Sequence, residues 1–180
     1  MDLAQVAQLL GLSYESEVVL SPSELLTRLV QINETLSKIG PGLTNEFLRV
    51  KLPGRERTVL GLINHISEIS SVLIEVLRGE VFTASKADAE PQTELVIAEL
   101  IPILLARNEV LKSVHIDPDR MADTYFGDQS LHTVINRTVW HSAQHLRQLV
   151  DLCQTQQAQL EIPEISHLLQ DLPLPQKVWD

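Results

Sequence analysis

Residues Ser130 to Gln157, with the sequence SLHTVINRTVWHSAQHLRQLVDLCQTQQ, decide the fold that this chain is expected to adopt. Mostly apolar side chains recur along them at intervals of three and four residues, which places them on one face of an α-helix. The members of this stripe are Leu131, Val134, Thr138, His141, His145, Leu149 and Leu152. We therefore expect a long amphipathic helix in which two histidines stand at positions of the apolar face.

Three earlier segments show the same periodicity and bring the number of expected long helices to four. The first begins at Ser21 with the capping-box sequence Ser-Pro-Ser-Glu and stops at the Gly-Pro-Gly of residues 40–42. The second covers about residues 58–79 and starts with a threonine that can cap it. The third covers about residues 93–113, with a kink expected at Pro102 because proline removes one backbone hydrogen bond.

The composition favours an all-α fold. Leucine accounts for 30 of the 180 residues and aromatic residues for only 4%, which suits rows of helix-forming side chains better than a β-sandwich. We expect a single domain over residues 1–180, a four-helix bundle with long crossover connections and a core at about residues 20–158. A short helix is expected at residues 2–10, and a proline-rich tail, residues 159–180, is expected to wrap the surface.

The charge balance argues against several classes of partner. With 14 Lys and Arg against 24 Asp and Glu, the net charge is −10, so the chain as a whole repels nucleic-acid backbones and anionic lipids. The apolar stretch at residues 95–106 is interrupted by Glu99 and Pro102, and it is shorter than the ~20 residues of a spanning helix. We therefore expect neither a nucleic-acid partner nor a membrane segment.

Cysteine usage and the N-terminal sequence suggest a cytoplasmic protein. The single cysteine, Cys153, cannot form an intramolecular disulfide. The first residues, Met-Asp-Leu-Ala-Gln, lack the basic segment and the long apolar segment of a signal peptide.

His141 and His145 form the most informative constellation in the sequence. On a helix, residues four apart have Cβ atoms about 5–6 Å from each other, so both imidazoles can bind one metal ion. The residue after His141 is Ser142, so the glutamate of the H-E-x-x-H metalloprotease signature is missing. A metal site other than that of a zinc peptidase is therefore expected.

His65 is the best candidate for a third ligand, because it lies at the inward edge of the helix expected at residues 58–79. Three neutral imidazoles around a divalent ion leave a coordination position open, as catalytic sites do. The alternative is that the three are core histidines hydrogen-bonded to other groups. Imidazole ligands suit zinc, nickel, iron and copper, so the pattern does not choose the metal.

Three further side chains are candidates for the surroundings of this site. Arg137 lies one turn before His141, and Gln148 lies three residues after His145, so both share the ligand face and could contact an anionic substrate or a ligand. Glu68 lies one turn after His65, where it could accept the free N–H of a ligand imidazole. The alternatives are a solvated arginine, a glutamine at the bundle edge and an exposed glutamate.

A histidine in the second long helix, in the sequence Asn64-His65-Ile66, and the sequence WHSAQHLRQL from Trp140 to Leu149 in the fourth resemble the DinB-like (DinB/YfiT) superfamily. The resemblance covers about residues 20–158. It implies a four-helix bundle, often a homodimer, that holds a divalent metal, usually zinc or nickel, through His65, His141 and His145. The N-terminal segment and the proline-rich tail lie outside it.

The resemblance leaves the activity open. Some members of the superfamily are metal-dependent enzymes that use a low-molecular-weight thiol, which implies here a metal-dependent transferase or hydrolase. A bound divalent ion is suited to such chemistry because it lowers the pKa of a coordinated thiol or water. The competing hypothesis is a non-catalytic bundle for dimerisation or partner binding, in which the metal is structural or absent.

Overall fold

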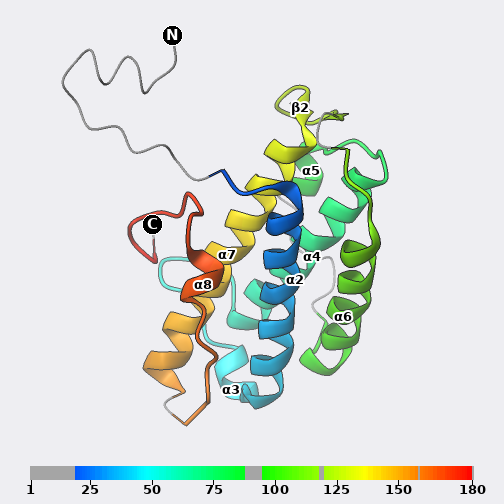
Figure 1. Cartoon of the computed structure of the whole chain (residues 1–180). Coiled ribbons are helices and arrows are strands. Elements are labelled where there is room, and N and C mark those ends of the chain that lie inside the picture. Colours follow the sequence, from blue (N-terminus) through cyan, green and yellow to red (C-terminus); the bar gives the residue numbers. More distant parts are fainter. Residues whose placement is uncertain (1–18, 88–94, 118–119, 158, 180) are drawn as a thin grey trace, which may run out of the picture.

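A computed structural model describes residues 19–87, 95–117, 120–157 and 159–179 of the chain, and these residues are mostly helical (Figure 1). The all-α class expected from the composition is confirmed, with a two-stranded sheet as the one addition among the described residues. The helix expected at residues 2–10 lies outside the described residues.

The four long helices are α2 (Pro22–Ile39), α4 (Val59–Leu77), α6 (Ile97–Ser113) and α7 (Leu131–Gln156). Three of them begin where their capping residues predicted. Ser21 and Glu24 form the expected capping box of α2, and the hydroxyls of Thr58 and Ser130 accept backbone N–H groups at the starts of α4 and α7. Helix α6 starts at Ile97 rather than at about residue 93, so its expected start was wrong.

Shorter elements occupy the stretches between the long helices and the C-terminal tail. They are a 3-10 turn η1 (Gly40–Gly42), α3 (Asn45–Leu48), α5 (Ala84–Ala87), β1 (Met121–Ala122), β2 (Gln129–Ser130) and α8 (Ser166–Leu169). Thr44 caps α3 by accepting the N–H of Phe47, whose ring is buried. The strands β1 and β2 pair antiparallel and bring the chain back to the start of α7.

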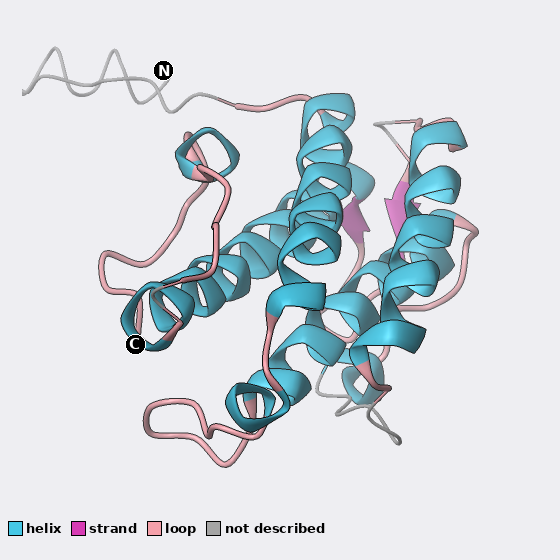
Figure 2. Ribbon diagram, turned by 90° about the horizontal axis from the view of Figure 1, so that it is seen from below, coloured by secondary structure: helices cyan, strands magenta, loops and turns pink. Residues whose placement is uncertain are grey.

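Helices α2 and α4, which follow each other among the long helices, pack against α6 and α7 more than against each other. Helix α2 lies mainly against α6 and α7, and α4 lies against the same two helices (Figure 2). The consecutive helices α2 and α4 contact each other only slightly, so residues 40–58 cross from one side of the packed helices to the other. This arrangement brings α4 and α7, which carry the candidate ligands, side by side.

Two clusters of buried apolar side chains fill the interior. One joins the C-terminal half of α2 to α4, α6 and α7 and includes Ile165 and Leu168 of the C-terminal segment. The other lies towards the start of α7, around Leu25, Leu73 and Ile135. The stripe predicted for α7 is buried except at His141, which is half-buried.

Helix α4 is strongly apolar. Among the described residues it is the one helix long and apolar enough to cross a membrane, by length and composition alone. It is a different segment from residues 95–106, the apolar stretch that the sequence made most prominent. Because 67% of an 18-residue window of this helix is buried inside the structure, α4 also has the character of a core helix.

A buried polar network ties α2, α4 and α6 together between the apolar side chains. The Asn33 amide nitrogen donates to Asn108 Oδ1 at 2.8 Å and to Ser70 Oγ at 3.3 Å. The Asn108 amide nitrogen donates in turn to the Val30 carbonyl oxygen at 3.2 Å. All three polar side chains are buried, so each group depends on the others for its hydrogen bonds.

Replacing Asn33 by alanine should therefore lower the free energy of unfolding by about 2 kcal/mol, because it leaves buried polar groups of Asn108 and Ser70 with fewer partners. Chemical denaturation followed by circular dichroism measures the loss. Ser37→Ala is the matched control, because Ser37 is half-buried and bonds only to the Asn33 carbonyl within its own helix. Equal effects of the two substitutions would contradict a special role for the network.

Candidate metal centre

The structure brings His65 of α4 together with His141 and His145 of α7. One ring nitrogen from each lies within 4.8 Å of the other two. The ring centroid of His65 is 5.5 Å from that of His141 and 5.1 Å from that of His145. Because metal–nitrogen bonds to zinc are about 2.0–2.1 Å long, a small further convergence of the rings would let all three hold one ion.

Burial keeps the imidazoles of His141 and His145 neutral by lowering their pKa values. His65 and His145 are only 6% and 5% exposed, while His141 is half-buried. Desolvation lowers the pKa of His145 to about 3, with a smaller contribution from His141. It also lowers the pKa of His141 to about 4, with smaller contributions from the positive charge of Arg137 and two other arginines. Neutral imidazoles carry the lone pairs that a metal ion needs.

Gln148 determines which nitrogen of His145 is available. Its amide nitrogen donates to the Val178 carbonyl oxygen at 3.0 Å, and this acceptor fixes the orientation of the amide. The amide oxygen, Oε1, then lies 2.8 Å from His145 Nδ1 and can only accept, so Nδ1 carries the proton. The lone pair of His145 is therefore on Nε2, which lies 2.9 Å from His141 Nε2.

The C-terminal segment closes over this part of α7. The Val178 carbonyl oxygen also accepts from the Gln144 amide nitrogen at 2.7 Å. Arg147 donates to the carbonyl oxygens of Pro175 and Gln176 at 2.8 and 3.1 Å. Segment 175–179 is thus bound to the same stretch of α7 that carries His145 (Figure 1). The sequence alone did not predict this contact.

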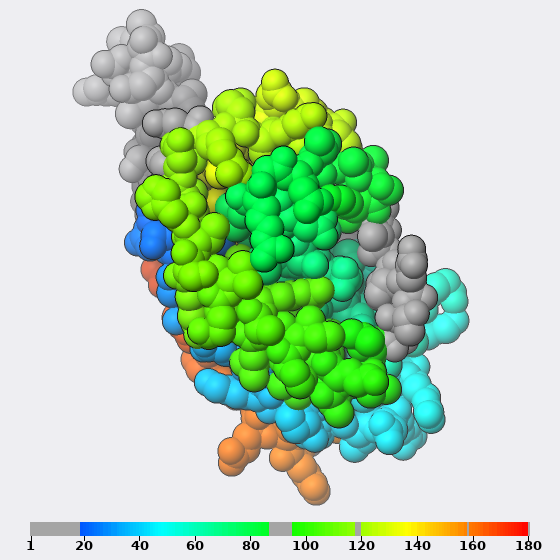
Figure 3. Space-filling view, turned by 90° about the vertical axis from the view of Figure 1, so that its right-hand side faces the viewer, coloured from blue at the N-terminus to red at the C-terminus, as the bar shows by residue number. Residues whose placement is uncertain are grey.

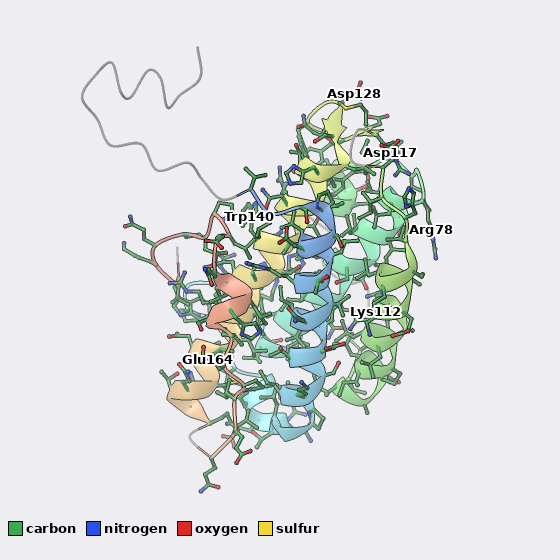
Figure 4. All side chains as sticks on the ribbon, viewed as in Figure 1. Arg78, Lys112, Asp117, Asp128, Trp140 and Glu164 are labelled. Carbon is green, nitrogen blue, oxygen red and sulfur yellow. The ribbon has the colours of Figure 1, made fainter. Side chains whose placement is uncertain are left out.

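Both tryptophans of the chain lie on α7 or contact it. Trp140, labelled in Figure 4, has its ring centroid 5.8 Å from that of His141. The indole N–H of Trp179 donates to Asp151 Oδ2 at 2.8 Å and so anchors the end of the described tail to α7. No periodicity marks the tail, so only its spatial path shows that it belongs to the site.

A cavity of about 150 Å³ lies next to His65 and His141. Its wall includes Glu68 and Arg137, two of the residues that the sequence singled out. Tyr125, from the connection between β1 and β2, also lines it. The imidazole cluster is therefore adjacent to a space that a small molecule can enter.

Glu68 lies on the cavity wall, and its carboxylate accepts from Arg107 Nη2 of α6 at 3.3 Å. Arg107 also donates to the carbonyl oxygen of Ser67 at 2.6 Å. The carboxylate therefore joins α4 to α6. Glu68, a candidate acceptor for the free N–H of a ligand imidazole, forms an ion pair with Arg107 in the structure.

Arg137 is exposed and is held by aromatic groups. Its Nη2 donates to the Tyr125 hydroxyl at 3.0 Å, and its guanidinium carbon is 4.7 Å from the ring centroid of Phe126. Such cation–π stacking holds a guanidinium in one place without neutralising its charge.

Other candidate residues lie outside this centre. Cys153 is buried, and desolvation raises the pKa of its thiol to about 11, which makes it unreactive at neutral pH. His115 and His167 are exposed. His132 is half-buried, and its Nε2 lies 2.9 Å from the Leu20 carbonyl oxygen because the chain entering α2 passes beside it.

Neither a family model nor a curated protein matches this chain. The resemblance to the DinB-like superfamily therefore depends on the residues themselves: His65, His141, His145 and the helices that carry them.

Replacing Gln148 by leucine should weaken binding of a divalent ion about ten- to hundredfold, because it removes the group that fixes the His145 tautomer. Competition titration against a chromophoric chelator measures the affinity. Gln144→Leu is the matched control, since Gln144 also donates to the Val178 carbonyl, while the hydrogen bond of His145 Nδ1 is with Gln148. A similar loss of affinity in both variants would assign the effect to the tail instead of to the imidazole.

The metal-free protein should lose stability as the pH falls from 7 to 5. His141 and His145 are neutral in the folded state down to about pH 4 and 3, whereas in the unfolded chain they take up protons near the ordinary value of 6.5. The unfolded state thus binds more protons in this range, so acid favours unfolding. Melting temperatures measured with a chelator present should fall with pH, and a variant with leucine at both positions should show a flatter dependence. A flat profile in the wild-type protein would contradict the lowered pKa values.

Proposed function

We propose that this chain is a divalent-metal-binding protein that holds one ion through His65, His141 and His145. The observation that carries the proposal is the convergence of three imidazoles, with the lone pair of His145 aimed at His141 by Gln148. Among the described residues, these three histidines form the group of metal-ligating side chains whose ligand atoms lie close enough together to surround one ion. Zinc and nickel are the proposed metals, and iron and copper suit the same donors.

The surroundings support a catalytic site rather than a closed structural one. Structural zinc sites have four protein ligands, whereas three ligands leave a position for water or substrate. His141 is half-buried and borders the 150 Å³ cavity, so that position can be reached from outside. A bound divalent ion would lower the pKa of a coordinated water or thiol and polarise a carbonyl group.

The proposed activity is that of a metal-dependent transferase or hydrolase with a low-molecular-weight thiol as cosubstrate. The residues of this chain would have separate roles in it. Gln148 would hold His145 in the ligating tautomer, and Arg137 would orient the substrate at the cavity mouth. We propose the thiol cosubstrate and a homodimeric assembly from the resemblance to the DinB-like superfamily. We propose a cytoplasmic location from the sequence.

The packing of the four long helices supports the same family. Helices α4 and α7 pack against each other and present the histidines inward, and crossing connections join the helices. We propose a single-domain, DinB-like four-helix bundle with the tail held against α7.

Elemental analysis of untagged, freshly purified protein tests the metal site. We expect close to one ion per chain in the wild type and its loss in His65→Ala and in His141→Ala. His167→Ala is the control, because His167 is exposed and lies on α8. The helical circular-dichroism signal should stay largely intact in all variants, since apolar burial stabilises the helices.

Two outcomes would contradict the proposal. Metal that is absent even after reconstitution with zinc or nickel would leave the three residues as core histidines. Loss of helicity together with loss of metal would point to a structural ion.

A further inference from the structure

Three charged side chains line the cavity beside His65 and His141, and two of them are already paired. Lys86 of α5 lies 2.6 Å from a Glu75 oxygen and 3.1 Å from a Glu80 oxygen. Glu68 is paired with Arg107, as described above. Their charges are therefore largely balanced inside the protein.

Arg137 is the third, and it has no carboxylate partner among the described residues. Its polar contact is with the neutral hydroxyl of Tyr125, and its other contacts are with aromatic faces. A guanidinium has five N–H donors, so most of them stay available. The chain has a net charge of −10, yet Arg137 lies at the mouth of the cavity without a carboxylate partner among the described residues.

The segments that hold Arg137 in place also shape the cavity. Phe82 and Thr124 form a bridge between the backbone before α5 and the connection of β1 to β2, and these segments lie next to each other in Figure 3. The Phe82 ring packs edge-on against the Tyr125 ring, with centroids 5.6 Å apart. The aromatic wall therefore comes from two separate parts of the sequence.

The size and lining of the cavity restrict what it can hold. Its volume of about 150 Å³ corresponds to roughly five water molecules at about 30 Å³ each. Phe82, Ile69 and Val72 make part of its wall apolar. A suitable ligand is consequently small, with a short apolar body and a polar group at each end.

The electrostatic surroundings favour a negative end. Arg137 is the charged side chain of the cavity wall that has no carboxylate partner among the described residues. One available guanidinium matches one negative charge, which suits a carboxylate better than a doubly charged phosphate. Arg137 and His141 are also one helical turn apart, so their Cβ atoms are about 5–6 Å from each other and one small molecule can reach both.

We propose that the cavity binds a small carboxylic acid whose carboxylate pairs with Arg137 while a second donor atom at its other end reaches the ion held by the three histidines. This inference rests on the proposed metal site and names the substrate class for it. Arg137 is thus assigned to substrate binding and specificity, and the aromatic wall accommodates the short body of the acid.

Cobalt-loaded protein provides a test that does not require knowledge of the reaction. The probes are mercaptoacetate and 2-mercaptoethanol, which carry the same thiol and differ in having a carboxylate or a hydroxyl at the other end. Each is titrated while the absorption band of the thiolate–cobalt bond is followed. We expect the preference for mercaptoacetate to be about tenfold greater in the wild type than in Arg137→Met, the effect of one charge-assisted pair. Arg137→Lys should keep part of the preference for mercaptoacetate.

Arg78→Met is the matched control, because Arg78 is exposed at the C-cap of α4, away from the cavity lining (Figure 4). It removes the same charge and should leave the preference unchanged. Mercaptomethylphosphonate tests the phosphate alternative: binding through Arg137 that is tighter than that of mercaptoacetate would overturn the assignment to a carboxylate.

The results separate this inference from the metal proposal. Cobalt bound stoichiometrically, with the same preference in the wild type and in Arg137→Met, would overturn the carboxylate site and leave the metal site standing. Failure of the wild type to bind cobalt, shown by elemental analysis, would overturn both.

Discussion

Three imidazoles, two of them buried and one half-buried, lie where α4 packs against α7 and impose the main constraint on this structure. An imidazole in an apolar interface is costly unless each polar nitrogen has a partner, and its charged form is costlier still. The lowered pKa values of His141 and His145 reflect the cost of the charged form. The close approach of their Nε2 atoms reflects the need of each ring nitrogen for a partner. A divalent ion would satisfy the nitrogen lone pairs together, which no single hydrogen-bond donor can do.

The support for this cluster comes from segments far apart in the sequence. His145 depends on Gln148, and the orientation of Gln148 depends on a backbone carbonyl of the C-terminal segment. On the cavity side, Arg137 depends on the aromatic residues before α7 for its position. Ligand geometry and pocket geometry are thus set by different parts of the chain, so a substitution in one need not disturb the other.

Local signals in the sequence predicted the helices and brought the right histidines together. Ser21, Thr58 and Ser130 marked helix starts because a side-chain acceptor there replaces a missing backbone partner. His65 could be matched with α7 because the period of an apolar stripe shows which residues face inward. The tail contacts and the bond between Asn33 and Asn108 could not be predicted, since such pairings depend on tertiary packing and leave no periodic pattern.

The two tryptophans of the chain both lie around the candidate ligands, Trp140 next to His141 and Trp179 in the segment that reaches Gln148. Intrinsic indole fluorescence therefore originates entirely from this region and carries no signal from α2, α4 or α6. Open-shell ions such as nickel or copper quench nearby indoles, whereas zinc has a filled d shell and does not. The emission of the unlabelled protein thus reports both on the seating of the tail and on the kind of ion bound.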